Sequence, residues 1–241
     1  MPREIQRAPT GFIAAAALVF VLACHAAGSQ GAIAERYGGR SMIVYLPPHL
    51  PAPGTRALVI VLHGGLGNAQ RIETAQSESG LNMVTLVGYV KGAIGYVIGK
   101  YAIDRSRIFG IGHSNGAMMI QRLMCERNLM AAAVPVSGPL NLDTKSCPAA
   151  RGKRVLAIHG ADDMNVPMGG GRGTVGFSHA VYNAEESTRR VFIDSGASYD
   201  LVVVDKADHK LEHIDAALRQ TERQTAAEKA VKFFGIGVRT Q

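Results

Sequence analysis

The stretch Gly112-His113-Ser114-Asn115-Gly116 decides the fold because of what lies on either side of it. Residues 107–111 form a short apolar run of strand type, and residues 117–124 have helix-forming composition. Strand, Gly-x-Ser-x-Gly and helix in this order are the context that a nucleophile elbow requires. Glycine two residues either side of Ser114 lets strand and helix close up, while the serine backbone carries the strain. The stretch therefore predicts a nucleophilic serine, against the alternative of a glycine-rich turn with an incidental serine.

Strands and helices alternate along the rest of the chain. Apolar runs predict strands, and apolar residues at helical spacing predict helices. Such alternation favours one α/β domain with a mostly parallel sheet that helices cover on both faces. The expected strands are 41–46, 57–62, 107–111, 131–136, 155–158 and 201–204, and the expected helices are 68–84, about 90–101, 117–124 and 211–234.

The N-terminus has the pattern of a secretory signal peptide. Arg3 and Arg7 precede an apolar run at 11–23, and small residues follow at 26–28. A charged segment, a short apolar segment and a small-residue cleavage zone are typical of such peptides. We therefore expect a signal peptide at 1–27, a single domain at 28–241, and an extracellular or periplasmic protein. A retained membrane anchor and lipidation at Cys24 are the alternatives.

Export would place Cys125 and Cys147 in an oxidising compartment, where we expect a disulfide between them; two buried thiols are the alternative. The net charge of +7, or +6 without residues 1–27, comes from scattered Lys and Arg. This pattern does not favour nucleic acid as a partner. We expect no metal, because metal-ligand spacings such as H-E-x-x-H or C-x-x-C do not occur. We expect no membrane contact beyond export, because no later stretch of the sequence is long and apolar enough to cross a bilayer.

A serine hydroxyl becomes a nucleophile only when a base takes its proton and a carboxylate orients that base. In hydrolases built on α/β sheets, the chain order is serine, acid, histidine, with the last two on loops after later strands. Strand 155–158 leads into two adjacent acids, Asp162 and Asp163, and strand 201–204 leads into His209. His213 lies inside the expected final helix and fits the base less well.

The oxyanion of an acyl-transfer reaction needs backbone donors. We expect one from the N–H of Asn115, directly after the nucleophile, and one from the N–H of Gly65, in the loop after strand 57–62. The other histidines near these motifs are interpreted as structural: His63 braces the oxyanion loop, His113 fills a variable elbow position, and His159 packs beside the acid loop.

With these motifs the chain resembles the exported esterases grouped with polyhydroxybutyrate depolymerases and feruloyl esterases, over nearly all of residues 35–236. The resemblance implies an α/β-hydrolase fold, a carboxylic ester substrate and no cofactor. Its H-G-x-x-D-x-x-V-P frame selects Asp163 over Asp162, so the implied triad is Ser114, Asp163 and His209. The matching stretches are 61–65, 110–119, 125–126, 136–138, 159–167 and 207–209.

One part of the chain departs from that family. Such enzymes usually have another sheet strand and a long loop between the helix ending near Val84 and the next helix. Here only residues 85–89 intervene, and a typical strand alone needs about 5–6 residues. Either residues 83–87 form a shortened strand, or a central strand is absent.

The sequence thus predicts an exported serine ester hydrolase that works through an acyl-enzyme, on a polyester, a feruloyl ester or a small acyl ester. The alternative is a catalytically impaired relative that binds ester polymer without turnover. A serine peptidase on the same fold has no separate support.

Overall fold

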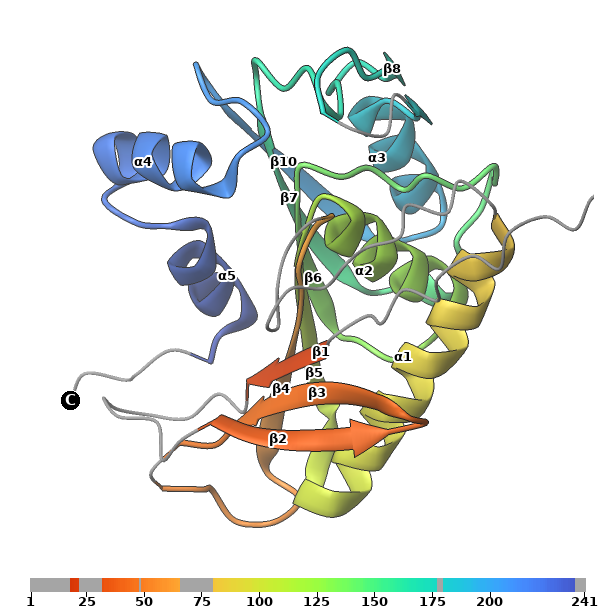
Figure 1. The fold of residues 1–241 in the computed structure, drawn as a ribbon, viewed down its shortest axis with the longest axis vertical. Helices are drawn as coiled ribbons and strands as arrows, with labels where there is room; N and C mark the ends of the chain where they lie inside the picture. Colours follow the sequence, from red (N-terminus) through yellow and green to blue (C-terminus); the bar gives the residue numbers. More distant parts are fainter. Residues whose placement is uncertain (1–17, 22–31, 48, 66–79, 177–179, 237–241) are drawn as a thin grey trace, which may run out of the picture.

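The computed structural model describes residues 18–21, 32–47, 49–65, 80–176 and 180–236. Within them one long sheet has helices on both faces (Figure 1). Its strands are β1 (Leu18–Val21), β2 (Ala32–Tyr37), β3 (Arg40–Tyr45), β4 (Arg56–Leu62), β5 (Ile103–His113), β6 (Ala132–Val136), β7 (Arg154–Gly160) and β10 (Ser198–Val204), in the spatial order β10-β7-β6-β5-β4-β1-β3-β2. The helices are α1 (Gly80–Tyr101), α2 (Asn115–Glu126), α3 (Glu185–Asp194), α4 (Leu211–Glu222) and α5 (Ala226–Phe234), with the 3₁₀ turn η1 (Pro148–Ala150).

The centre of the sheet is parallel: β4, β5, β6, β7 and β10 all run in one direction. Leu58 and Ile60 of β4 belong to the same buried cluster as residues of α1 and α2, whereas Ala57 and Val59 belong to the cluster that includes α4 and α5. Because side chains alternate along a strand, a continuously apolar strand can serve two cores at once. The predicted mostly parallel sheet covered on both faces is confirmed.

Residues 83–87 do not form a strand. They belong to α1, a single helix from Gly80 to Tyr101 that replaces the two helices expected on either side of residues 85–89. Val90, Ile94 and Val97 are buried on one side of this helix, against the sheet. Residues 68–79 of the expected helix 68–84 lie outside the described residues.

The place next to β4 is taken by β1, which comes from inside the predicted signal peptide. β1 pairs in parallel with β3 through four residue pairs and antiparallel with β4 through three. It therefore bridges the parallel centre and the hairpin formed by β2 and β3. Among the described residues, no helix is long and apolar enough to cross a membrane.

The C-terminal part has more elements than the sequence predicts. The expected helix at 211–234 is two helices, α4 and α5, because Arg223 takes a left-handed conformation (φ 56°) that ends α4. α3 and the small hairpin of β8 (Gly171–Arg172) and β9 (Val181–Tyr182) are not predicted at all. They follow β7 and cover one end of the sheet (Figure 1).

A buried carboxylate joins β2 to α1. Glu35, 9% exposed, accepts hydrogen bonds from the hydroxyls of Tyr96 (2.9 Å) and Tyr101 (2.8 Å) and from the ammonium of Lys100 (2.5 Å). Lys100 is the leading cause that lowers the pKa of Glu35, with both tyrosines acting in the same direction against desolvation. This cluster belongs to the hairpin end of the sheet.

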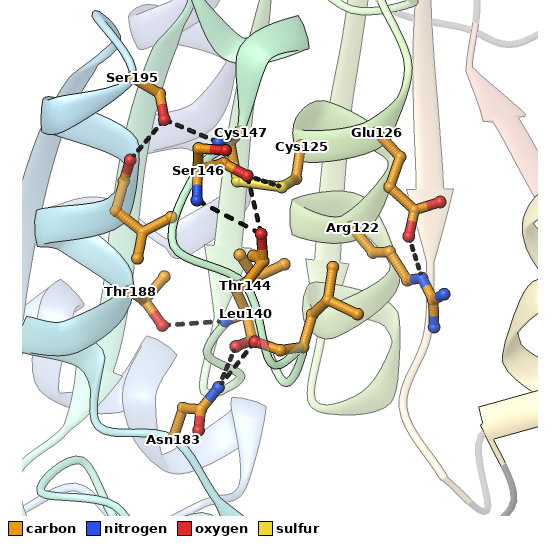
Figure 2. The surroundings of a disulfide bond; sticks show 12 residues. Arg122, Cys125, Glu126, Leu140, Thr144, Ser146, Cys147, Asn183, Thr188 and Ser195 are labelled. Atoms are coloured by element: carbon orange, nitrogen blue, oxygen red, sulfur yellow. Dashed lines mark hydrogen bonds and ion pairs between the residues drawn. A yellow bond between two sulfur atoms is a disulfide. The ribbon is translucent and has the colours of Figure 1, made fainter.

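A disulfide joins Cys125 of α2 to Cys147, the residue before η1 (Figure 2). The loop that ends at Cys147 is also held by α3: Ser195 accepts from the Cys147 N–H (2.7 Å), and Thr188 accepts from the Leu140 N–H (3.1 Å). Closing a loop of this length stabilises a fold by about 2–4 kcal/mol. The disulfide ties the helix after Ser114 to the loop after β6.

Candidate active site

Ser114 sits at the turn between β5 and α2, with φ 55° and ψ −122°. Its N–H donates to the Val136 carbonyl of β6 (2.9 Å), which fixes the turn to the neighbouring strand. A Cβ at position 116 would come within 2.2 Å of the Leu62 carbonyl oxygen, and one at 112 within 2.4 Å of the Gly116 backbone. Only glycine fits at both places, so the motif's two glycines let α2 start directly against β4 and β5.

Three side chains from distant parts of the sequence meet at this turn. His209 Nε2 lies 2.9 Å from Ser114 Oγ, and His209 Nδ1 lies 2.7 Å from Asp163 Oδ2. Ser114 follows β5, Asp163 follows β7 and His209 follows β10, so all three lie at the carboxyl edge of parallel strands. This is where ligand sites of open α/β sheets form.

The Asp163 carboxylate is surrounded by donors. Its Oδ1 accepts from the N–H groups of Asn165 (2.9 Å) and Val166 (2.8 Å), while Oδ2 faces His209 and, at 3.3 Å, His159 Nε2. Burial alone would raise the pKa of Asp163, but the hydrogen bonds of His159 and His209 hold it far below its ordinary value. Asp163 is therefore ionised at neutral pH and its position is fixed from both oxygens.

The two alternative residues lie elsewhere. Asp162 is exposed, and its N–H donates to the Ala207 carbonyl. His213 lies on α4 with half of its side chain exposed, and its Nδ1 contacts Asp208 Oδ1 at 2.9 Å. Within the described residues, no group of three or more His, Cys, Asp or Glu side chains is placed to hold a metal ion.

The two expected oxyanion donors come from the start of α2 and from the loop after β4. Asn115 is the first residue of α2, where backbone N–H groups have no partner inside the helix. The loop after β4 runs close to the nucleophile turn, because a Cβ at Gly64, the residue before the expected donor Gly65, would lie 2.8 Å from Ser114 Cβ. His63 Nδ1 lies 2.7 Å from the Gly64 carbonyl, and burial lowers the pKa of His63, so a neutral imidazole braces this loop.

His113 contacts the base directly, which its position in the motif does not reveal. Its Nε2 lies 2.8 Å from the His209 carbonyl oxygen, and the two rings are 5.0 Å apart. Because burial lowers the pKa of His113, the neutral ring donates this hydrogen bond. His113 thus supports the backbone and one face of His209. Only the fold, not sequence spacing, brings residues 113 and 209 together.

His159 is fully buried in β7 behind Asp163. Its Nδ1 lies 2.8 Å from Glu185 Oε1, and its Nε2 lies 2.8 Å from the Val166 carbonyl. Desolvation opposes the charged ring, but the hydrogen bonds to Asp163 and Glu185 prevail and raise the pKa of His159 to about 9. The residue packs beside the acid loop, as expected, and it also carries a charge, which the sequence does not indicate.

This buried charge predicts how stability depends on pH. The folded-state pKa of about 9 exceeds the unfolded value near 6.5, so the stabilisation is complete below pH 6.5 and is lost as pH rises toward 9. The contribution is on the order of 3 kcal/mol. We expect the melting temperature to fall between pH 6.5 and 9, and His159→Gln to flatten this part of the profile. If the melting temperatures of wild type and His159→Gln changed in parallel between pH 6.5 and 9, His159 would not be the charged group responsible.

No protein-family model matches this chain, and no curated protein matches it. Among solved structures it is similar to the protein Atu2452 of unknown function from Agrobacterium tumefaciens, with a TM-score of 0.50, 18% identity, and coverage of 70% of this chain and 78% of that one. Two others are Arabidopsis thaliana SOBER1 (TM-score 0.47, 16% identity, 65% of this chain and 66% of that one) and the Bacillus cereus carboxylesterase (0.47, 15%, 74% of each). The match thus spans just under two thirds of SOBER1. Such identities bear on the fold alone. The parallel sheet with helices on both faces and the strand–serine–helix turn after β5 show that the chain has the α/β-hydrolase fold.

Proposed function

We propose that this protein is a serine hydrolase of carboxylic esters. The observation that carries the proposal is the continuous contact from Ser114 Oγ through His209 to Asp163, at 2.9 and 2.7 Å. Both distances are within hydrogen-bond reach, the geometric requirement for a nucleophile and its base. Asp163 faces the nitrogen of His209 opposite the serine, as the orienting member of such a triad must.

In the proposed reaction, Ser114 Oγ attacks the ester carbonyl while His209 Nε2 takes the serine proton. The N–H groups of Asn115 and Gly65 stabilise the oxyanion. His209 then returns the proton to the leaving alcohol, which departs from an acyl-enzyme at Ser114. Water, activated by His209, releases the acid and restores the serine. Asp163 stays ionised and stabilises the imidazolium of His209 in both steps.

The proposed substrates are a polyester, a feruloyl ester or a small acyl ester, as the resemblance to polyhydroxybutyrate depolymerases and feruloyl esterases implies. We also propose that the protein is exported. The charged and apolar N-terminal pattern supports export, as does the disulfide between Cys125 and Cys147, which needs an oxidising compartment to persist.

An active-site probe tests the nucleophile. We expect a fluorophosphonate to label the protein once, at Ser114, because the activated Oγ displaces fluoride from phosphorus while His209 takes the proton. Peptide mass spectrometry locates the adduct. Ser114→Ala should remove the labelling, and Ser137→Ala, which changes a nearby buried serine, serves as the matched control. Undiminished labelling of Ser114→Ala would disprove the proposed nucleophile.

The second candidate is a catalytically impaired relative that binds ester polymer without turnover. It is favoured by one observation: residues 83–87 are helical, so this segment adds no strand to the sheet, where the family that the chain resembles usually has one. Hydrolysis of a short p-nitrophenyl ester by the purified protein separates the two candidates. Turnover that depends on Ser114 excludes the binding-only function, and fluorophosphonate labelling without any turnover supports it.

A further inference from the structure

A connected set of buried polar side chains begins at Asp163, the acid of the three-residue site, and continues into the interior. Each is at most 3% exposed, and they come from five separate segments: α2, β7, the loop after β7, α3 and β10. Burying so many polar groups is costly unless every one is hydrogen-bonded. The residues of this network are Gln121, His159, Asp163, Glu185 and Tyr199.

The network runs from the acid to the nucleophile turn. Glu185 contacts His159 through Oε1 (2.8 Å) and the Tyr199 hydroxyl through Oε2 (3.0 Å). The Tyr199 hydroxyl is also 3.3 Å from Gln121 Oε1, and Gln121 Nε2 donates to the Gly138 carbonyl (2.8 Å). Gly138 is packed against the Ser114 carbonyl, since a Cβ there would lie 2.4 Å from that oxygen. The residues that hold Asp163 and those that pack against the Ser114 backbone are therefore connected through a single chain of contacts.

The contacts of His159 determine its protonation. Nε2 faces the Val166 carbonyl (2.8 Å) and Asp163 Oδ2 (3.3 Å), and Nδ1 faces Glu185. A carbonyl and an ionised carboxylate can only accept, so with Glu185 ionised both ring nitrogens of His159 donate. A neutral imidazole has a single N–H, so one of its two nitrogens would face a buried acceptor with no proton between them. The ring is therefore an imidazolium between two carboxylates.

We propose that His159 is a positioning residue for the triad, an imidazolium that fixes the Asp163 carboxylate and offsets part of the negative charge that Asp163 presents to His209. The inference rests on the proposed function, because it concerns the same site. His159 touches neither substrate nor the reacting atoms. It acts through Asp163 Oδ2, the oxygen that also faces His209.

The charges around His159 predict the direction in which each variant changes proton uptake by His209. In His159→Gln the cation nearest Asp163 is lost, so His209 faces a more negative acid and gains a proton more readily. In Glu185→Gln the cation stays while its second counter-charge is lost, so the effect has the opposite sign. Among the described residues, the titratable groups facing the site from neighbouring elements are Asp163, Glu185, Tyr199, His209 and His113, with Glu212 beyond His113 and Arg189 beyond Tyr199.

The experiment is the pH profile of kcat/KM for a short p-nitrophenyl ester, whose acid limb reports proton uptake by the base. We expect His159→Gln to move this limb to higher pH by about half a unit and Glu185→Gln to move it to lower pH. In His159→Gln, kcat should also fall about tenfold or more, with little change in KM, because the acid is less well placed.

Glu35→Gln is the matched control, because it removes the charge of another buried, fully hydrogen-bonded carboxylate far from the site. It should lower the melting temperature without moving the acid limb. Shifts of the same sign in His159→Gln and Glu185→Gln, or no shift in either, would show that the network only stabilises the fold and would overturn the proposal.

An NMR measurement decides the point without catalysis. We expect the ¹⁵N-labelled full-length protein at pH 7.5 to show His159 with both ring nitrogens protonated, and His159→Gln to shift the His209 Nδ1–H signal. A wild-type protein without ester turnover would overturn the proposed function, while these spectra would still test the role of His159. A singly protonated His159, or an unmoved His209 signal, would overturn the positioning proposal.

Discussion

Replacing His209 by alanine should lower kcat for a p-nitrophenyl ester by about 10⁴–10⁶-fold, with no comparable change in KM. His209 is the only group within the described residues that contacts both Ser114 Oγ and Asp163. Without it, the serine proton has no acceptor and Asp163 has nothing to orient. The residual rate should come from substrate binding and the oxyanion donors. Steady-state kinetics with the purified protein measure the effect.

His213→Ala is the matched control. It removes an imidazole four residues along the chain that contacts only Asp208 in the described structure and is half exposed. We expect its kcat within about twofold of wild type, because exposed ion pairs contribute little and His213 does not reach Ser114. Equal losses in His209→Ala and His213→Ala, or full activity in His209→Ala, would contradict the assigned base.

The placement of Ser114, Asp163 and His209 at one sheet edge could be expected from the sequence for a topological reason. Each follows an apolar run, and parallel strands bring their carboxyl ends to the same side. The elbow adds a local signal, because glycines are needed where backbone atoms approach within about 3 Å. Short-range patterns and strand order are therefore enough to predict Ser114, Asp163 and His209, whereas the contacts between their side chains follow only from the structure.

The buried network could not be expected in the same way. His159 and Glu185 are 26 residues apart and come from a strand and a helix, so no spacing rule connects them. α3 is not among the expected helices, although its first turn holds Glu185 and Glu186, an arrangement typical of helix N-termini. Glu185, the partner of His159, therefore lies in a helix that the sequence patterns do not predict.

The region around residues 83–87 shows where local pattern and fold diverge. The run 83–87 has strand-like composition, yet it lies in α1, because the helical spacing of buried residues continues from Val87 through Val97. The sheet position next to β4 is then filled by a segment some 40 residues earlier than β4. A distant segment can supply a strand, and no local window of sequence contains that information.

This gives the second large prediction: removal of residues 1–27 should destabilise the fold strongly. The truncation deletes β1, which pairs with both β3 and β4. Each backbone hydrogen bond contributes about 0.5–1.5 kcal/mol, and domains are stable by only about 5–15 kcal/mol. The loss should lower the melting temperature by about 10 °C or more. Thermal unfolding of the oxidised proteins, followed by circular dichroism, measures it.

A truncation lacking only residues 1–17 is the matched control, since it removes Arg3, Arg7 and part of the apolar run but keeps Leu18–Val21. It should melt close to the full chain. Phe20→Pro in the full chain should behave like the longer truncation, because a strand with neighbours on both sides does not accommodate proline. A signal peptide cleaved near residue 27 would remove residues 18–21, whereas a folded β1 needs these residues to stay in the sheet. Equal melting temperatures for the two truncations would therefore exclude β1 from the working fold and favour a cleaved leader, whereas a large difference would show that β1 belongs to the stable fold and favour an exported protein that keeps it.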